Sequence, residues 1–136
     1  MESKIEQAVA LHNKGYNCAQ AIVCTYAEQF GIDIETAYKL SEGFGFGMGM
    51  MSVCGALSGG LMVAGFKNSA GTQAPGATKV ATYKIDRAMA QAFEQATGSL
   101  FCAELKGRDT GKPLCSCEEC IRCGARIVEE QLLADK

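Results

Sequence analysis

Along most of this sequence, helix-capping residues precede apolar stretches of helical period, and glycines follow them. The clearest case starts at Asn17, because Gln20 stands three residues later in the spacing of a capping box. Apolar residues then line one side of residues 18–30 until Gly31, in the usual position of a C-terminal glycine. This punctuation predicts an all-α fold, in which helices must bury their apolar faces against one another.

Residues 43–51 interrupt the pattern with glycine at every second position. Since glycine costs a helix about 1 kcal/mol relative to alanine, we expect a tight loop, with Gly47 and Gly49 where the backbone approaches a neighbour or a ligand. Residues 53–67 then form a helix of small residues, in which Gly55 and Gly59 permit close approach. The expected architecture is a single helical cysteine-rich domain, 1–136: a compact bundle of about five to six helices, with the glycine-rich loop before a central small-residue helix.

Charge and composition exclude several classes of partner. Thirteen basic residues stand against 15 acidic ones, and tryptophan is absent, so neither a basic stripe nor a base-stacking surface is expected. We therefore predict no nucleic-acid partner. The sequence has no signal peptide and no apolar run long enough for a membrane span, which predicts a cytoplasmic protein.

Eight cysteines in 136 residues need a chemical explanation. A reducing cytoplasm disfavours structural disulfides, so metal binding or redox chemistry becomes the leading interpretation. Four cysteines fall at predicted helix starts, where unpaired N–H groups and the helix dipole stabilise a thiolate. These candidate ligands of a metal or cofactor are Cys18, Cys54, Cys102 and Cys117.

The densest cysteine cluster lies near the C-terminal end, in the spacing C-x-C-x2-C-x2-C over residues 115–123. Cys115 and Cys120 are auxiliary candidates, whereas Cys24 and Cys123 are interpreted as packing residues. Gly124 stands where a haem attachment motif needs histidine, so no haem is expected. A complete zinc ribbon would need a second C-x2-C pair, which the sequence lacks.

The cysteines resemble the redox-active protein family defined by the pattern C…GCAxxG…C…C. The matching segments are NCAQA at Cys18, the glycine-rich GFGFGMG, CGALSG at Cys54, FCAEL at Cys102, and Cys117 with Ile121 and Ala125 after it. Val53 stands where the pattern has glycine. The resemblance implies a helical protein with four family cysteines, Cys18, Cys54, Cys102 and Cys117. A related domain occurs in split-Soret cytochromes, for which an iron–sulfur centre has been suggested.

Three functional hypotheses follow. The first is a cysteine-ligated metal or iron–sulfur centre for electron transfer or redox sensing, in an oxidoreductase or an electron-transfer accessory protein. Its redox partner protein is not identified by the sequence. The second is a thiol–disulfide redox protein, and the third is a zinc-binding interaction module. His12, the only histidine, is interpreted as a half-buried helix residue, which leaves a Cys–His hydrolase little support. The smooth central helix also suggests a homodimer.

Overall fold

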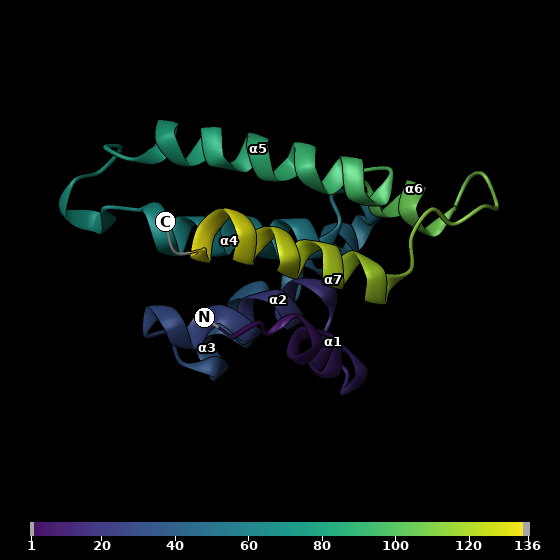
Figure 1. Cartoon of the computed structure of the whole chain (residues 1–136), viewed down its shortest axis with the longest axis horizontal. Coiled ribbons are helices and arrows are strands. Elements are labelled where there is room, and N and C mark those ends of the chain that lie inside the picture. Colours follow the sequence, from purple (N-terminus) through teal and green to yellow (C-terminus); the bar gives the residue numbers. More distant parts are fainter. Residues whose placement is uncertain (1, 135–136) are drawn as a thin grey trace.

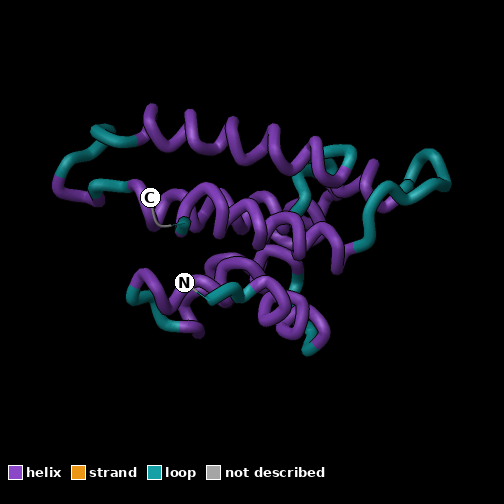
Figure 2. Tube along the Cα trace, in the orientation of Figure 1, coloured by secondary structure: helices purple, strands orange, loops and turns teal. Residues whose placement is uncertain are grey.

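The computed structural model describes residues 2–134, and in that range the chain is helical apart from turns and one isolated β-bridge (Figure 2). The all-α prediction is confirmed. The described chain holds seven α-helices, slightly more than the five to six expected, and the shortest, after Phe101, has only five residues. They are α1 (Ile5–Asn13), α2 (Cys18–Tyr26), α3 (Ile34–Ser41), α4 (Gly55–Asn68), α5 (Lys79–Thr97), α6 (Cys102–Lys106) and α7 (Cys117–Val128).

The helices form layers around α4 and α7 (Figure 1). Helix α5 lies along one side of this pair, and α1 and α2 lie on the other side, with α3 beyond α2. The core is built from the apolar faces that meet between these layers, with Tyr26 and Phe93 among its largest fully buried side chains. No helix within residues 2–134 has both the length and the apolar character needed to cross a bilayer.

Small residues bring α4 into close contact with two neighbours. A Cβ added to Gly59 would lie 2.9 Å from the carbonyl oxygen of Ala19 on α2. On the other side, a Cβ added to Gly124 of α7 would lie 2.7 Å from the carbonyl oxygen of Ala56. The smooth surface of α4 therefore serves packing within the chain, and the homodimer stays a prediction.

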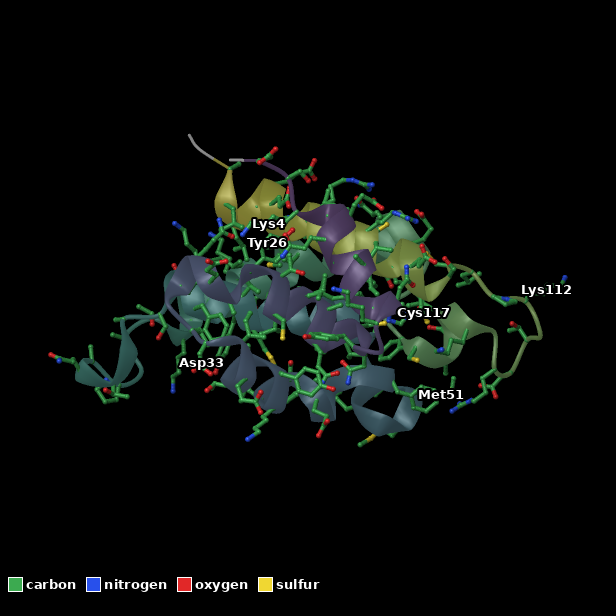
Figure 3. The ribbon with its side chains drawn as sticks, turned by 90° about the horizontal axis from the view of Figure 1, so that it is seen from below. Lys4, Tyr26, Asp33, Met51, Lys112 and Cys117 are labelled. Atoms are coloured by element: carbon green, nitrogen blue, oxygen red, sulfur yellow. The ribbon has the colours of Figure 1, made fainter. Side chains whose placement is uncertain are left out.

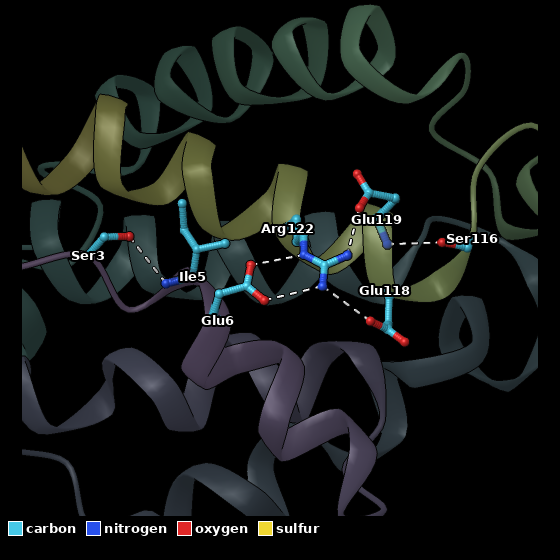
Figure 4. A network of polar contacts seen from close by, with 7 residues as sticks. All are labelled: Ser3, Ile5, Glu6, Ser116, Glu118, Glu119 and Arg122. Atoms are coloured by element: carbon cyan, nitrogen blue, oxygen red, sulfur yellow. Dashed lines mark hydrogen bonds and ion pairs between the residues drawn. The ribbon is translucent and has the colours of Figure 1, made fainter.

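Local capping explains where some helices begin. The Asn17 side chain accepts a hydrogen bond from the Gln20 backbone and the Gln20 side chain accepts one from the Asn17 backbone, which confirms the predicted capping box at α2. Ser116 likewise caps α7 by accepting from the Glu119 backbone at 3.1 Å. The Glu119 carboxylate, which could complete a second box, instead pairs with Arg122 (Figure 4).

Two helices begin later than the sequence suggests. Serine is a favoured capping residue, and Ser52 and Ser99 stand just before α4 and α6, but the N-cap positions belong to Cys54 and Phe101. The reason is a pairing distant in sequence: the amide of Cys54 donates to Leu100, the amide of Cys102 donates to Ser52, and Val53 and Phe101 form an antiparallel bridge. These extended segments hold the starts of α4 and α6 side by side.

The glycine-rich segment is a contorted turn rather than a strand. It contains a 3-10 turn at Glu42–Phe44 and an irregular turn at Gly47–Met51, in which Met48, Gly49 and Met50 have non-helical backbone angles. Phe46, Met48 and Met51 have positive φ angles of 52°, 60° and 56°, a conformation that is costly for residues with side chains. Such strain persists only where the surrounding structure holds it, and this segment forms part of the wall of the site described next.

Polar contacts hold the N-terminal helix against α7. Arg122 pairs with Glu6 of α1 as well as with Glu118 and Glu119 of its own helix (Figure 4). Further along, Glu129 accepts hydrogen bonds from the Tyr26 hydroxyl at 2.6 Å and from the Lys4 amide at 2.7 Å. Lys4 and Tyr26 lie next to each other in Figure 3.

Candidate cysteine centre

A cavity of about 180 Å³ lies at the end of the bundle where α2, α4, α6 and α7 begin. In Figure 1 this is the end at which α6 lies. Its wall is mostly apolar apart from sulfur, and it contains six of the eight cysteines. These are the four predicted ligands and both auxiliary candidates: Cys18, Cys54, Cys102, Cys115, Cys117 and Cys120.

Four of these cysteines lie at the starts of helices that border the cavity. Cys18, Cys102 and Cys117 are the first residues of α2, α6 and α7, and Cys54 is the N-cap residue of α4. The first-turn N–H groups of a helix have no partner in the helix and favour negative charge nearby. Several helix starts therefore surround one cavity, which suits it to hold an anionic group.

Two of the thiols form a pair that shares a hydrogen bond. The Cys18 thiol donates to Cys117, which lowers the pKa of Cys117 to about 5, and the ammonium of Lys106 contributes further to that lowering. The Lys106 Nζ lies 3.4 Å from the Cys117 Sγ. The same hydrogen bond and burial raise the pKa of Cys18. At neutral pH the pair is thus one thiol and one thiolate.

A second pair lies in the same cavity. The hydrogen bond with Cys120 lowers the pKa of Cys54, as do the backbone amides of Ala56 and Leu57 at the start of α4, whereas burial acts the other way. The pKa of Cys120 is raised, chiefly because its thiol donates to Cys54 and because it is buried. Cys120 also contacts Cys115, whose pKa is raised by burial.

Glycines keep the backbone close to these sulfur-bearing side chains. A Cβ at Gly47 would lie 3.0 Å from the Cβ of Cys102, and one at Gly55 would lie 3.2 Å from the Cβ of Cys18. Gly49 differs, because an added Cβ would meet nothing within 4 Å, and only its φ of +73° favours glycine. The expected close approach therefore holds at Gly47, Gly55 and Gly59 but not at Gly49.

The two cysteines that we interpreted as packing residues lie outside the cavity wall. Cys24 is buried in a small cluster between α2 and α3, and Cys123 is buried in the main core. Burial raises the pKa of both thiols. Cys24 lies in a different cluster from the thiol pairs, so it offers a matched control for experiments on the site, whereas Cys123 stands one turn after Cys120 on α7 and its charge acts on Cys115.

Among the cavity-wall residues that sequence analysis did not assign to the site are Phe46, Lys106 and His12. His12 is part of the wall as well as of α1, and its Nδ1 lies 2.9 Å from the carbonyl oxygen of Tyr16. Because that carbonyl can only accept, Nδ1 carries the hydrogen. The sequence could have indicated Lys106, because it stands four residues after Cys102 on one helix and residues at that spacing share a face.

Within residues 2–134, no three His, Cys, Asp or Glu side chains have the arrangement of a ready-made single-ion site. The thiols are arranged instead as two pairs. A family model with the description "Putative redox-active protein (C_GCAxxG_C_C)" matches residues 16–131. That range contains all six cysteines of the cavity. The searches of curated proteins and of solved structures return no match.

Proposed function

Because this chain belongs to the redox-active protein family with the C_GCAxxG_C_C cysteine pattern, we propose that its cavity is a redox centre in which thiolates hold an iron–sulfur cluster. The observation that carries the proposal is the arrangement of four thiols as two hydrogen-bonded pairs, Cys18 with Cys117 and Cys54 with Cys120, around one cavity. Each pair takes its members from different parts of the chain.

The residues present fit such a group. Thiolates are the ligands of iron–sulfur clusters, and a two-iron cluster takes four of them. The hydrogen bond within each pair places its two sulfur atoms near each other, as two ligands of one metal ion need to be. A volume of about 180 Å³ exceeds what one ion needs, since a water molecule takes roughly 10–15 Å³ on the same measure. The helix starts around the cavity supply N–H groups that stabilise a negatively charged group.

A bound cluster would supply one-electron transfer, and the chain's own residues would set the conditions for it. Burial of Cys54, Cys102 and Cys120, which are 6%, 5% and 2% exposed, limits the access of water to the sulfur atoms. Cys18, Cys115 and Cys117 are only partly buried, so the centre has a side from which a redox partner protein can approach. Electron transfer or redox sensing in the cytoplasm is the role we propose.

Anaerobic purification followed by iron, sulfide and zinc assays tests this function. We expect a coloured protein with about two irons and two sulfides per chain, as a two-iron cluster requires. Cys54→Ala should lose that iron, whereas Cys24→Ala should keep it, because Cys24 is buried away from the cavity. A colourless, iron-free chain after anaerobic reconstitution contradicts the proposal, and stoichiometric zinc in its place supports a zinc-binding module.

The contact between Cys18 and Cys117 favours a second candidate, a thiol–disulfide couple. With a pKa of about 5, Cys117 is a thiolate at neutral pH and a potential nucleophile. It would attack a partner disulfide and release one partner thiolate; Cys18 would then lose its proton, attack Cys117 and release the second. The partner is reduced and a Cys18–Cys117 disulfide forms. Redox titration with mass mapping tests this, and the absence of that disulfide under oxidising conditions excludes it.

A further inference from the structure

We propose that Lys106 is a positioning residue that raises the reduction potential of the cysteine centre, by placing a fixed positive charge against the sulfur of Cys117. This inference rests on the proposed function, since it concerns the same centre. It assigns a role to a residue outside the cysteine pattern. The argument depends on where α6 places the lysine and on which other charges face the cavity.

Helix α6 carries both a cysteine and the lysine to the cavity. It begins at Cys102 and ends at Lys106, so the two residues lie one turn apart on the same side. Gly107 then ends the helix with a φ of +71°, and a Cβ there would lie 2.6 Å from the backbone of Lys112 and Pro113. The end of α6, and with it the lysine, is therefore held in a tight turn.

Two contacts direct the ammonium of Lys106. Its Nζ lies 3.4 Å from the Cys117 Sγ and 5.6 Å from the centre of the Phe46 ring. A cation over an aromatic face is attracted by the ring, so Phe46 supports the position of the ammonium beside the sulfur. Phe46 itself belongs to the strained segment before α4 and lines the same cavity.

No competing carboxylate neutralises this charge in the described part of the chain. Lys106 forms no ion pair there, and the residues that line the cavity include no Asp or Glu. Partial burial lowers the pKa of Lys106, but the charge of Cys117 outweighs it, so the pKa lies above its ordinary value and the lysine is cationic. The positive charge of Lys106 therefore stabilises negative charge on the cavity sulfur atoms and is not neutralised by a carboxylate of the described chain.

Reduction makes the centre more negative, whichever group is present. A cluster gains one electron, and a Cys18–Cys117 disulfide gains two electrons and one proton and becomes a thiol and a thiolate, as the lowered pKa of Cys117 implies. A cation a few ångströms away stabilises the reduced state more than the oxidised state, so it raises the potential. Because Lys106 is partly exposed, solvent screening reduces the effect. We expect removal of the Lys106 charge to shift the equilibrium constant of the couple about tenfold toward the oxidised state.

The test compares four chains: wild type, Lys106→Met, Lys106→Arg and Lys112→Met. Methionine keeps an unbranched apolar side chain over Phe46 but removes the charge, and arginine restores the charge. Lys112 is a matched control, because it is an exposed lysine at the tip of the loop after α6, away from Cys117 (Figure 3). Lys112→Met changes the net charge of the chain by the same amount as Lys106→Met but leaves the cavity unchanged.

Each chain is measured in two forms. The reconstituted form is titrated with dithionite, which supplies one electron to the cluster. The metal-free form is equilibrated in dithiothreitol buffers, where dithiothreitol gives up two electrons and two protons and closes to its cyclic disulfide. One of those protons goes to Cys18 and the other to solvent. Thiol alkylation and mass mapping then report the fraction of Cys18–Cys117 disulfide.

We expect Lys106→Met to lower the potential by about 59 mV for the cluster and about 30 mV for the dithiol, the values of a tenfold change for one and two electrons. Lys106→Arg should restore most of the shift, and Lys112→Met should match wild type. Equal potentials for Lys106→Met and Lys112→Met overturn the inference. If wild type takes up no cluster, the proposed function fails while the dithiol couple still decides the role of Lys106. A chain with neither couple overturns both.

Discussion

Gly124 provides a test of the close packing between α7 and α4. In Gly124→Ala, the added Cβ would lie 2.7 Å from the carbonyl oxygen of Ala56 and 3.1 Å from its Cβ. Ordinary contact begins near 3.4 Å, so the two helices would have to separate by about 0.7 Å or accept strain. The nearest obstacle is backbone, which cannot rotate away as a flexible side chain can.

The expected loss of stability follows from two opposing effects. Overpacking of a well-packed core costs about 1–3 kcal/mol. Replacing glycine by alanine inside a helix returns up to about 1 kcal/mol. The net change for Gly124→Ala is therefore a loss of about 1 kcal/mol, or a fall of roughly 4 °C in Tm for a chain of this size.

Gly65 supplies the matched control on α4. An added Cβ there meets nothing within 4 Å, so Gly65→Ala should show only the helix-propensity gain, about 0.5–1 kcal/mol. Urea unfolding of the metal-free, reduced chains, followed by circular dichroism at a helix band, measures both variants. The reasoning predicts opposite signs, and a Gly124→Ala chain as stable as Gly65→Ala would refute the close approach of α7 to α4.

Three further predictions concern single residues. Tyr26→Phe should lose about 1–2 kcal/mol of unfolding free energy in urea, because Glu129 loses the 2.6 Å hydrogen bond from the hydroxyl; no loss would contradict that bond. Asn17→Ala should cost about 1 kcal/mol in the same assay, since the cap of α2 disappears; an unchanged midpoint counts against it. The rate of alkylation of Cys117 in the metal-free chain should rise with pH and reach half its plateau near pH 5, because the thiolate is the reactive form. Cys24, whose pKa is raised by burial, should need a pH above the ordinary thiol range. A midpoint for Cys117 within that ordinary range would contradict the lowered pKa.

Local sequence patterns were sufficient to predict the all-α fold class and part of the candidate site. The capping box at Asn17 and the cap at Ser116 act within four residues, so the sequence predicts the starts of α2 and α7 correctly. Cys18 and Cys117 could therefore be placed at helix starts from sequence alone. The start of α4 could not be predicted in this way, because it depends on the bridge between Val53 and Phe101. That bridge joins segments far apart in the chain, and no local sequence pattern indicates it.

The meeting of the cysteines depends on packing that the sequence does not encode locally. The spacing of residues 115–123 made Cys120 an auxiliary candidate, yet it contacts Cys54, which lies more than sixty residues away. Cys102, a member of the family pattern, lines the cavity, but no described thiol shares a hydrogen bond with it. The way in which α7 packs against both α2 and α4 decides which sulfur atoms become partners.

The glycines and the cysteines belong to one structural arrangement. Gly55 and Gly59 let α4 approach the start of α2, where added Cβ atoms would lie 2.9 Å from the backbone of Ala19. Gly124 similarly lets α7 approach α4. The two thiol pairs join α2 to α7 and α4 to α7, so the distance between sulfur atoms is set by how closely these helices pack. Larger residues at these glycines would separate the thiols without replacing any cysteine, which makes the small-residue helix part of the cysteine site as well as of the core.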